Sequence, residues 1–182
     1  CESPLSCLDT GWVSWATGSL HYDVPADVAP RSPWGPDIGF RRFYTSMYAP
    51  TVAPSGVNRA PLGARWQHNF MSWVDTPTGR PADVYTRVIH TPNGEDVFAS
   101  QSPGGVFPDP TWQHYDLQAG NHYQSFRQRL AAPNEYELRT RTGETLVYDS
   151  AGELIEVRDR VAAPNTNKVR IAWTTAGGLR SV

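Results

Sequence analysis

Proline and glycine are spread along the whole chain, and their frequency limits the folds that it can adopt. Of 182 residues, 16 are Pro and 15 are Gly, so few segments are long enough and uninterrupted enough for a helix. Between these interruptions lie short runs rich in β-branched and aromatic residues, which are typical of strands. The clearest runs are residues 17–24, 39–48, 64–75 and 83–90. We therefore predict a mainly β protein with little helix.

The second half of the chain contains regularly spaced turn signals. Asn93-Gly94, Thr142-Gly143 and Ala151-Gly152 each lie between two runs that suit strands, as expected of antiparallel hairpins. Residues 123–130 fit a short helix and a strand equally well, because their apolar side chains are spaced three and four apart. We expect these hairpins to form an open or partly wound antiparallel sheet.

Length and composition favour one continuous domain with an apolar core. The chain has a mass of 20.2 kDa and 39% apolar residues, enough to bury a core of ordinary size. Within it we distinguish a lead-in segment over residues 1–16, a β segment over residues 17–90 and a series of hairpins over residues 91–182.

The charge of the chain argues against a nucleic acid partner and against an anionic lipid surface. The net charge is −2, and the basic residues, all Arg except Lys168, are interleaved with acids, whereas such partners attract basic proteins. No apolar run approaches the roughly 20 residues that span a bilayer. We expect no nucleic acid partner and no membrane span.

Cys1 and Cys7 are the two cysteines of the chain. A disulfide closing this small loop is sterically allowed in an oxidising compartment. Lipidation of Cys1 is the alternative, because the mature chain of a bacterial lipoprotein also begins with Cys. A chain that starts with Cys rather than Met is expected to be processed or excised from a longer one.

No catalytic or metal-binding motif is recognised. The histidines at positions 21, 68, 90, 114 and 122 lack the spacing of metal ligands, and nucleophile and phosphate motifs are missing. His68, between aromatics in a predicted strand, is expected to be a core histidine with its hydrogen bonds satisfied. A hydrolase with an unrecognised carboxylate pair is the least favoured hypothesis. We therefore expect that the chain is not an enzyme and that it binds no cofactor.

Two ten-residue blocks near the end of the chain resemble each other. YDSAGELIEV begins at residue 148 and WTTAGGLRSV at residue 173; each has an aromatic residue, a polar turn ending in Gly and a second apolar run, which suits a hairpin. Asp149 is predicted to be a turn residue whose side chain accepts backbone N–H groups. The residues that carry the pattern are Tyr148, Asp149, Gly152, Leu154, Trp173, Gly177 and Leu179.

These blocks and the residues upstream resemble a known family. Residues 126–182 are similar to the opening repeats of RHS proteins, whose units are called YD repeats. Upstream, ATGSLHY from residue 16, PDIGFRRFYTS from residue 36 and LGARWQHNF from residue 62 resemble the segment that leads into those repeats. The chain departs from the family at Gly11-Trp12, where Asp-Pro is usual, at Arg65, where Gly is usual, and by an insertion over residues 161–166.

The resemblance implies a mechanical, non-enzymatic function. In RHS proteins many hairpin units wind into a β shell around a C-terminal toxin or signalling polypeptide, and the segment before the repeats begins or plugs that shell. It implies that residues 17–90 are this pre-repeat segment of a secreted or cell-surface bacterial protein, acting in toxin delivery, interbacterial competition or cell-surface interaction. The expected partners are the remaining shell or a downstream polypeptide, and self-association through an open sheet edge.

A self-contained, adhesin-like binding module is the alternative. Several Trp residues on one face would offer stacking surfaces to a glycan or a protein partner. Trp34, in a loop rich in Pro and Gly, is the best candidate for an exposed contact, whereas Trp66 and Trp73 are expected to fill the core.

Overall fold

The computed structural model describes most of the strand-forming segments of the chain. The described residues are 10–14, 16–27, 39–46, 62, 65–76, 86–91, 94–99, 111–117, 123–160, 167–173 and 179–181. They contain strands and turns and no helix. The strands are β1 (Thr10–Val13), β2 (Leu20–Asp23), β3 (Arg42–Thr45), β4 (Trp66–His68), β5 (Trp73–Asp75), β6 (Thr86–Thr91), β7 (Gly94–Ala99), β8 (Trp112–Leu117), β9 (Tyr123–Arg129), β10 (Tyr136–Thr140), β11 (Thr145–Tyr148), β12 (Leu154–Arg158), β13 (Lys168–Arg170), β14 (Ala172–Trp173) and β15 (Leu179–Ser181).

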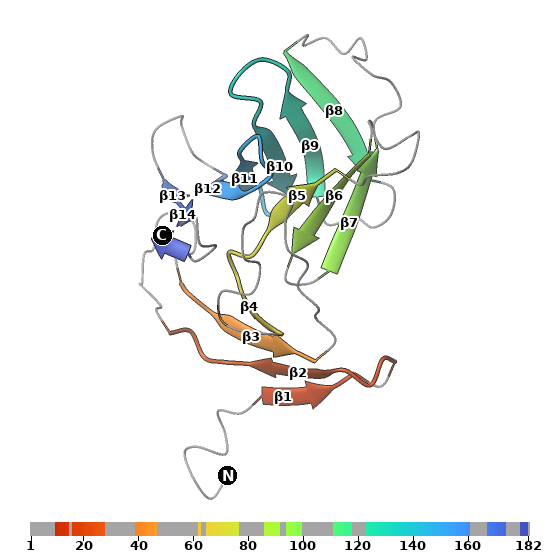
Figure 1. Cartoon of the computed structure of the whole chain (residues 1–182), viewed down its shortest axis with the longest axis vertical. Helices are drawn as coiled ribbons and strands as arrows, with labels where there is room; N and C mark the ends of the chain where they lie inside the picture. The colour runs from red at the N-terminus through yellow and green to blue at the C-terminus, as the bar shows by residue number, and fades with distance from the viewer. Residues whose placement is uncertain are drawn as a thin grey trace, which may run out of the picture. The chain divides into compact units, whose positions relative to one another are not determined.

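The strands form three antiparallel sheets in which neighbours in sequence are neighbours in space (Figure 1). One sheet runs from β1 to β4, the largest from β5 to β13, and the last pairs β14 with β15. The predicted mainly β, antiparallel fold is confirmed. Residues 123–129, which suited a helix and a strand equally well, form strand β9.

The chain divides into two compact units, which are described separately. Unit 1 comprises Cys1–Pro33, Asp37–Met71 and Ala172–Val182, and unit 2 comprises Trp34–Pro36 and Ser72–Ile171. Unit 1 contains the four-stranded sheet and the β14–β15 pair. Unit 2 contains the nine-stranded sheet.

The sheet of unit 2 curls into a half-barrel whose concave face holds the core. Phe126 of β9 pairs with Tyr115 of β8 and with Leu138 of β10, and all three are buried. Such rows form because alternate side chains of a strand point to the same face. Strands β6 and β7 are joined as a hairpin, in which Thr91, the last residue of β6, pairs with Gly94, the first residue of β7. Of the predicted turn pair Asn93-Gly94, Gly94 thus lies in the strand, and Asn93 lies outside the described residues.

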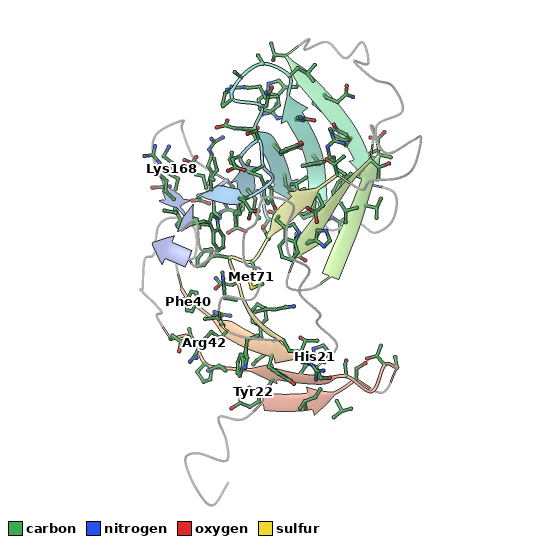
Figure 2. All side chains as sticks on the ribbon, in the orientation of Figure 1. His21, Tyr22, Phe40, Arg42, Met71 and Lys168 are labelled. Atoms are coloured by element: carbon green, nitrogen blue, oxygen red, sulfur yellow. The ribbon has the colours of Figure 1, made fainter. Side chains whose placement is uncertain are left out.

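In unit 1 an aromatic row crosses the four-stranded sheet. Tyr22 of β2 pairs with Tyr44 of β3, which pairs with Trp66 of β4; His21 and Tyr22 are labelled on β2 in Figure 2. The ring of Trp66 meets those of Tyr22 and Tyr44 edge to face, with centroids 6.4 and 5.6 Å away. Edge-to-face contact is an arrangement that aromatic pairs favour. All three rings are half-buried, so Trp66 is less buried than the core position expected for it.

Candidate functional site

The turn between β11 and β12 is built around Asp149. Its carboxylate Oδ1 accepts hydrogen bonds from the backbone N–H groups of Ala151 and Glu153, both at 2.9 Å. Its own N–H donates to the carbonyl oxygen of Glu153 at 2.9 Å, and the N–H of Gly152 donates to the carbonyl oxygen of Asp149 at 2.9 Å. A short acidic side chain suits this position because it accepts hydrogen bonds from two backbone N–H groups that the pairing of β11 with β12 does not use. Asp149 therefore holds the turn together.

Gly152 brings this turn against the opposite edge of the sheet. It has a φ of 85°, which disfavours every residue with a Cβ. A Cβ built there would lie 2.1 Å from the carbonyl oxygen of Val74. The N–H of Val74 donates to the carbonyl oxygen of Gly152 at 2.8 Å, and Trp73 forms an isolated antiparallel bridge with Glu153. Because β5 is the first strand of the nine-stranded sheet and β12 is next to the last, these contacts close the curl.

Tyr148 anchors the same closure from within the core. Its side chain is fully buried, and its hydroxyl lies 2.8 Å from Oγ of Ser72. The Ser72 hydroxyl donates to the carbonyl oxygen of His90 at 3.0 Å, so the Tyr148 hydroxyl is the donor in the bond to Ser72. Tyr148 thus connects β11 to the start of β5 and to β6.

A second cluster at β5 and β6 was not predicted from the sequence. Oδ2 of Asp75 accepts a hydrogen bond from the indole N–H of Trp73 at 3.0 Å and lies 3.0 Å from Nε2 of His90. The rings of Trp73 and His90 stack with centroids 4.7 Å apart. The cluster depends on the backbone pairing of Trp73 with His90 across β5 and β6, which the sequence alone does not show. These contacts fasten β5 to β6. In the described part of the chain no group of three or more His, Cys, Asp or Glu could hold a metal ion.

The two similar ten-residue blocks have the same backbone register. In the first, Tyr148 pairs with Leu154, and the register shifts between Val147 and Tyr148. In the second, Trp173 pairs with Leu179, and the register shifts between Ala172 and Trp173. Both hairpins therefore pair the leading aromatic residue with the Leu that the two blocks share, and in both the register shifts directly before the aromatic residue. The similarity of the sequences extends to the geometry.

The remaining predicted residues are only partly described. Trp173 is half-buried in β14, and Leu179 is described by its backbone in β15. The predictions at Cys1, Cys7, Trp34 and Gly177 lie outside the described residues.

His68 differs from the expected satisfied core histidine. It is completely buried in β4, and its Nδ1 accepts the backbone N–H of Phe70 at 3.2 Å. Its Nε2 has no hydrogen-bond partner among the described residues; the rings of Phe40 and Trp173 lie 5.3 and 6.0 Å away. Burial lowers the pKa of His68 from 6.5 to about 4, because a charged imidazole loses its hydration there. The ring is therefore neutral at pH 7 with its proton on Nε2.

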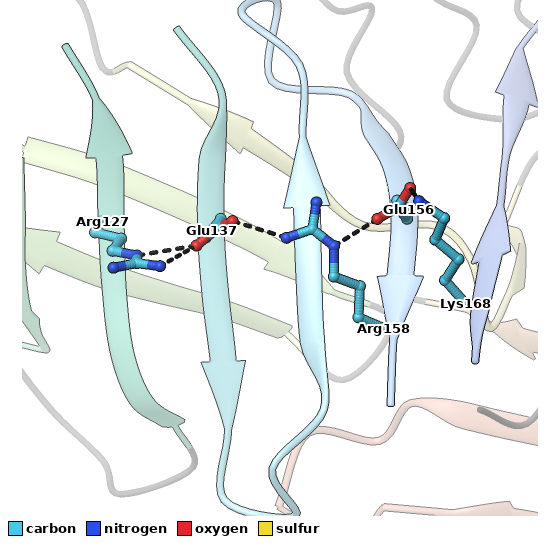
Figure 3. A network of polar contacts seen from close by, with 5 residues as sticks. All are labelled: Arg127, Glu137, Glu156, Arg158 and Lys168. Carbon is cyan, nitrogen blue, oxygen red and sulfur yellow. Dashed lines mark hydrogen bonds and ion pairs between the residues drawn. The ribbon is translucent and has the colours of Figure 1, made fainter. Parts of the chain in front are cut away.

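A ladder of charged side chains crosses the outer face of unit 2 (Figure 3). Glu137 of β10 accepts hydrogen bonds from Arg127 of β9, at 2.9 and 2.6 Å, and from Arg158 of β12, at 2.9 Å. The side chain of Arg158 extends across β11 to reach Glu137, and it also pairs with Glu156. Oε2 of Glu156 lies 3.2 Å from Nζ of Lys168. Burial raises the pKa of Glu156, but the hydrogen bonds from Arg158 and Lys168 outweigh it, so the pKa lies below its usual value. The alternating charges were visible in the sequence, but their strand-to-strand partners depend on the register.

The described residues include no helix long and apolar enough to cross a membrane. Comparison with models of known protein families, with curated proteins and with solved structures found no match to this chain.

Proposed function

We propose that the chain is a non-enzymatic structural module, the N-terminal part of an RHS-type YD-repeat shell that encapsulates or presents a C-terminal toxin or effector. The observation that carries the proposal is the common register of two hairpins, in which Tyr148 pairs with Leu154 and Trp173 with Leu179. A shell wound from hairpins requires a unit that repeats in backbone geometry and not only in composition.

The order of strands in unit 2 supports the same proposal. Strands β5 to β13 follow one another across the sheet in sequence order, so the sheet grows by one strand at a time. A continuous wall of any length can be built in this way, because each added hairpin covers the edge left by the one before it.

The closure of the curl supports a starting role for the upstream residues. The hydrogen bond between Val74 and Gly152 joins the first strand of the sheet to the turn of the first clear repeat. Residues 17–90 would thus begin or plug the shell. Its other end is β13, which pairs with β12 alone in the described part of the chain; the remaining shell or a downstream polypeptide is the proposed partner there. Secretion or display at a bacterial cell surface, in toxin delivery, interbacterial competition or cell-surface interaction, follows from this proposal.

The size of the native protein tests the proposal. An antibody raised against the 20.2 kDa chain should detect a much larger product in the source cells, and its reading frame should contain further Tyr-Asp-turn-Gly-Leu units after residue 182. Limited proteolysis of that product should leave the segment beyond the repeats protected until the shell is unfolded. A native product of about the mass of this chain would overturn the proposal.

The aromatic side chains of unit 1 do not favour the alternative of a glycan-binding module. Trp66 meets Tyr22 and Tyr44 edge to face, whereas a sugar ring stacks on an open aromatic face. The alternative still has a direct test at Trp34. Binding to a glycan array that is lost in Trp34→Ala would support it, and an array without signal would count against it.

A further inference from the structure

One cross-strand row on the outer face of unit 2 contains cations and hydroxyls but no carboxylate. Arg139 of β10 pairs with Ser125 of β9 on one side and with Thr145 of β11 on the other. Thr145 pairs with Arg158 of β12, which pairs with Lys168 of β13. Directly paired residues of neighbouring strands point to the same face. We call the residues Ser125, Arg139, Thr145, Arg158 and Lys168 the cationic row.

The next row along the strands contains the acids, but they are covered. It includes Glu137 and Glu156, whose side chains are 12% and 10% exposed. The cations that pair with them are more exposed: 20% for Lys168, 33% for Arg158, 37% for Arg127 and 76% for Arg170. The carboxylates therefore lie at the base of the ladder, and the positive groups face the solvent.

The outward residues of β9 to β13 carry a local excess of positive charge. Among them are six basic side chains and two acidic ones: Arg127, Arg129, Arg139, Arg158, Lys168 and Arg170 against Glu137 and Glu156. Unit 2 as a whole nevertheless has thirteen acidic and ten basic residues. The positive charge is thus concentrated on one face of a unit that is acidic overall.

We propose that this face docks an acidic segment of a polypeptide through the cationic row. Charge complementarity of this local kind gives a protein interface its specificity and orientation. Nucleic acid is disfavoured because a long polyanion extends beyond the row over the rest of unit 2, which is net negative, whereas a short acidic segment contacts the row alone. The inference does not depend on the proposed shell, since it uses only contacts within unit 2.

The row is organised before any partner arrives. Glu137 and Glu156 hold the guanidinium of Arg158, and Glu156 also holds the ammonium of Lys168. Side chains fixed in this way lose less conformational entropy on binding than free ones. The hydroxyl of Thr145 lies between Arg139 and Arg158 in the row, and that of Ser125 lies beside Arg139 at its end. Both hydroxyls can donate hydrogen bonds to a carboxylate. Carboxylates presented by an acidic segment match both kinds of donor.

Binding of a labelled oligoglutamate peptide to the whole chain, followed by fluorescence anisotropy at low ionic strength, tests the inference. We expect binding that weakens as salt is added, and that becomes about tenfold weaker in the double variant Arg139→Gln/Lys168→Gln, as the loss of two exposed ion pairs predicts. The matched control is Arg41→Gln/Arg65→Gln, which removes the same charge from two exposed residues of unit 1 and should bind as the unmodified chain does.

Three results would overturn the inference. They are no binding of the peptide, an equal loss of binding in both double variants, and tighter binding to duplex DNA, heparin or phosphatidylserine vesicles than to oligoglutamate. Circular dichroism establishes that each variant is folded. If Arg139→Gln/Lys168→Gln fails to fold, the single variant Arg139→Gln replaces it, because Arg139 is exposed and takes part in no contact of the ladder. Binding of the peptide to Arg139→Gln as tightly as to the unmodified chain would then overturn the inference.

Discussion

The backbone N–H of Val74 donates a hydrogen bond of 2.8 Å to the carbonyl oxygen of Gly152. These residues belong to β5 and to the turn before β12, so their bond joins the start of the nine-stranded sheet to a turn near its end. The two backbones can approach this closely because Gly152 has no side chain between them. The closure of unit 2 thus depends on one glycine.

Replacing Gly152 by Ala should therefore be severely destabilising. The new Cβ would lie 2.1 Å from the carbonyl oxygen of Val74, and backbone rather than a flexible side chain would have to move. We expect a loss of about 4 kcal/mol in the free energy of unfolding, or failure to fold, measured by urea denaturation.

Gly18→Ala is the matched control for that substitution. Gly18 also has a positive φ, 67°, but a Cβ there would meet nothing within 4 Å. Only the cost of the backbone conformation remains, about 1 kcal/mol. Equal losses for the two variants would show that the approach to Val74 is not what requires glycine.

Asp149 should act as a hydrogen-bond acceptor rather than as a charge. In Asp149→Ala the N–H groups of Ala151 and Glu153 lose their common acceptor, and we expect a loss of about 2 kcal/mol in the free energy of unfolding. Asp149→Asn keeps an oxygen in the place of Oδ1 and should lose less than half of that. If Asn proves as damaging as Ala, the negative charge matters and the acceptor role is insufficient.

The hairpins of unit 2 could be predicted from the sequence because their signals are local. Thr142-Gly143 and Ala151-Gly152 are turns between strands, and Gly143 and Gly152 both have positive φ, as such turns require. Segment 123–130 could not be decided, since the spacing of its apolar residues suits a helix. Pairing of β9 with β8 and β10 on its two sides settled it as a strand, which shows tertiary context overriding a local pattern.

The closing contacts could not be predicted, because they depend on how the whole sheet curls. Nothing near Gly152 in the sequence indicates that Val74 lies against it. The position of Val74 is set by the twist accumulated over the intervening strands. The cationic row could not be predicted from the sequence for a related reason. The register shift between Val147 and Tyr148 changes which residues of β11 and β12 pair with one another.

The hydroxyl of Tyr148 should stabilise unit 2 mainly through Ser72. The two oxygens lie 2.8 Å apart in the core, so a double-mutant cycle of Tyr148→Phe and Ser72→Ala should give a coupling energy of about 1 kcal/mol. Urea denaturation of the two single variants and the double variant supplies the measurement. Strictly additive losses would mean that the two hydroxyls stabilise the fold independently.

His68 should make stability depend on pH in the acid range. Its pKa is about 4 in the folded chain and about 6.5 when unfolded. The stability that its neutral form contributes is complete above pH 6.5 and is lost as the pH falls through that value toward 4. The loss should amount to about 3 kcal/mol by pH 4.

A variant that cannot titrate isolates the contribution of His68. His68→Asn retains an acceptor for the N–H of Phe70 but no ionisable group. Between pH 7 and pH 4, the free energy of unfolding from urea titrations should therefore fall by about 3 kcal/mol less in His68→Asn than in the unmodified chain. Parallel pH profiles would show that His68 is hydrated or finds a partner for its second proton.

Among the described residues, β13 pairs on one side alone, with β12, and its other edge predicts how the isolated chain associates. Such an edge presents unpaired backbone groups that recruit another strand. If two β13 strands pair antiparallel about Val169, Lys168 of one copy lies opposite Arg170 of the other, and the like charges repel. We expect weak self-association that strengthens with added salt and in Lys168→Gln/Arg170→Gln, measured by sedimentation velocity over a wide range of concentration. A chain that is strictly monomeric with and without these charges would show that β13 is not available for pairing, and the proposed shell would lose the edge at which its next repeat must add.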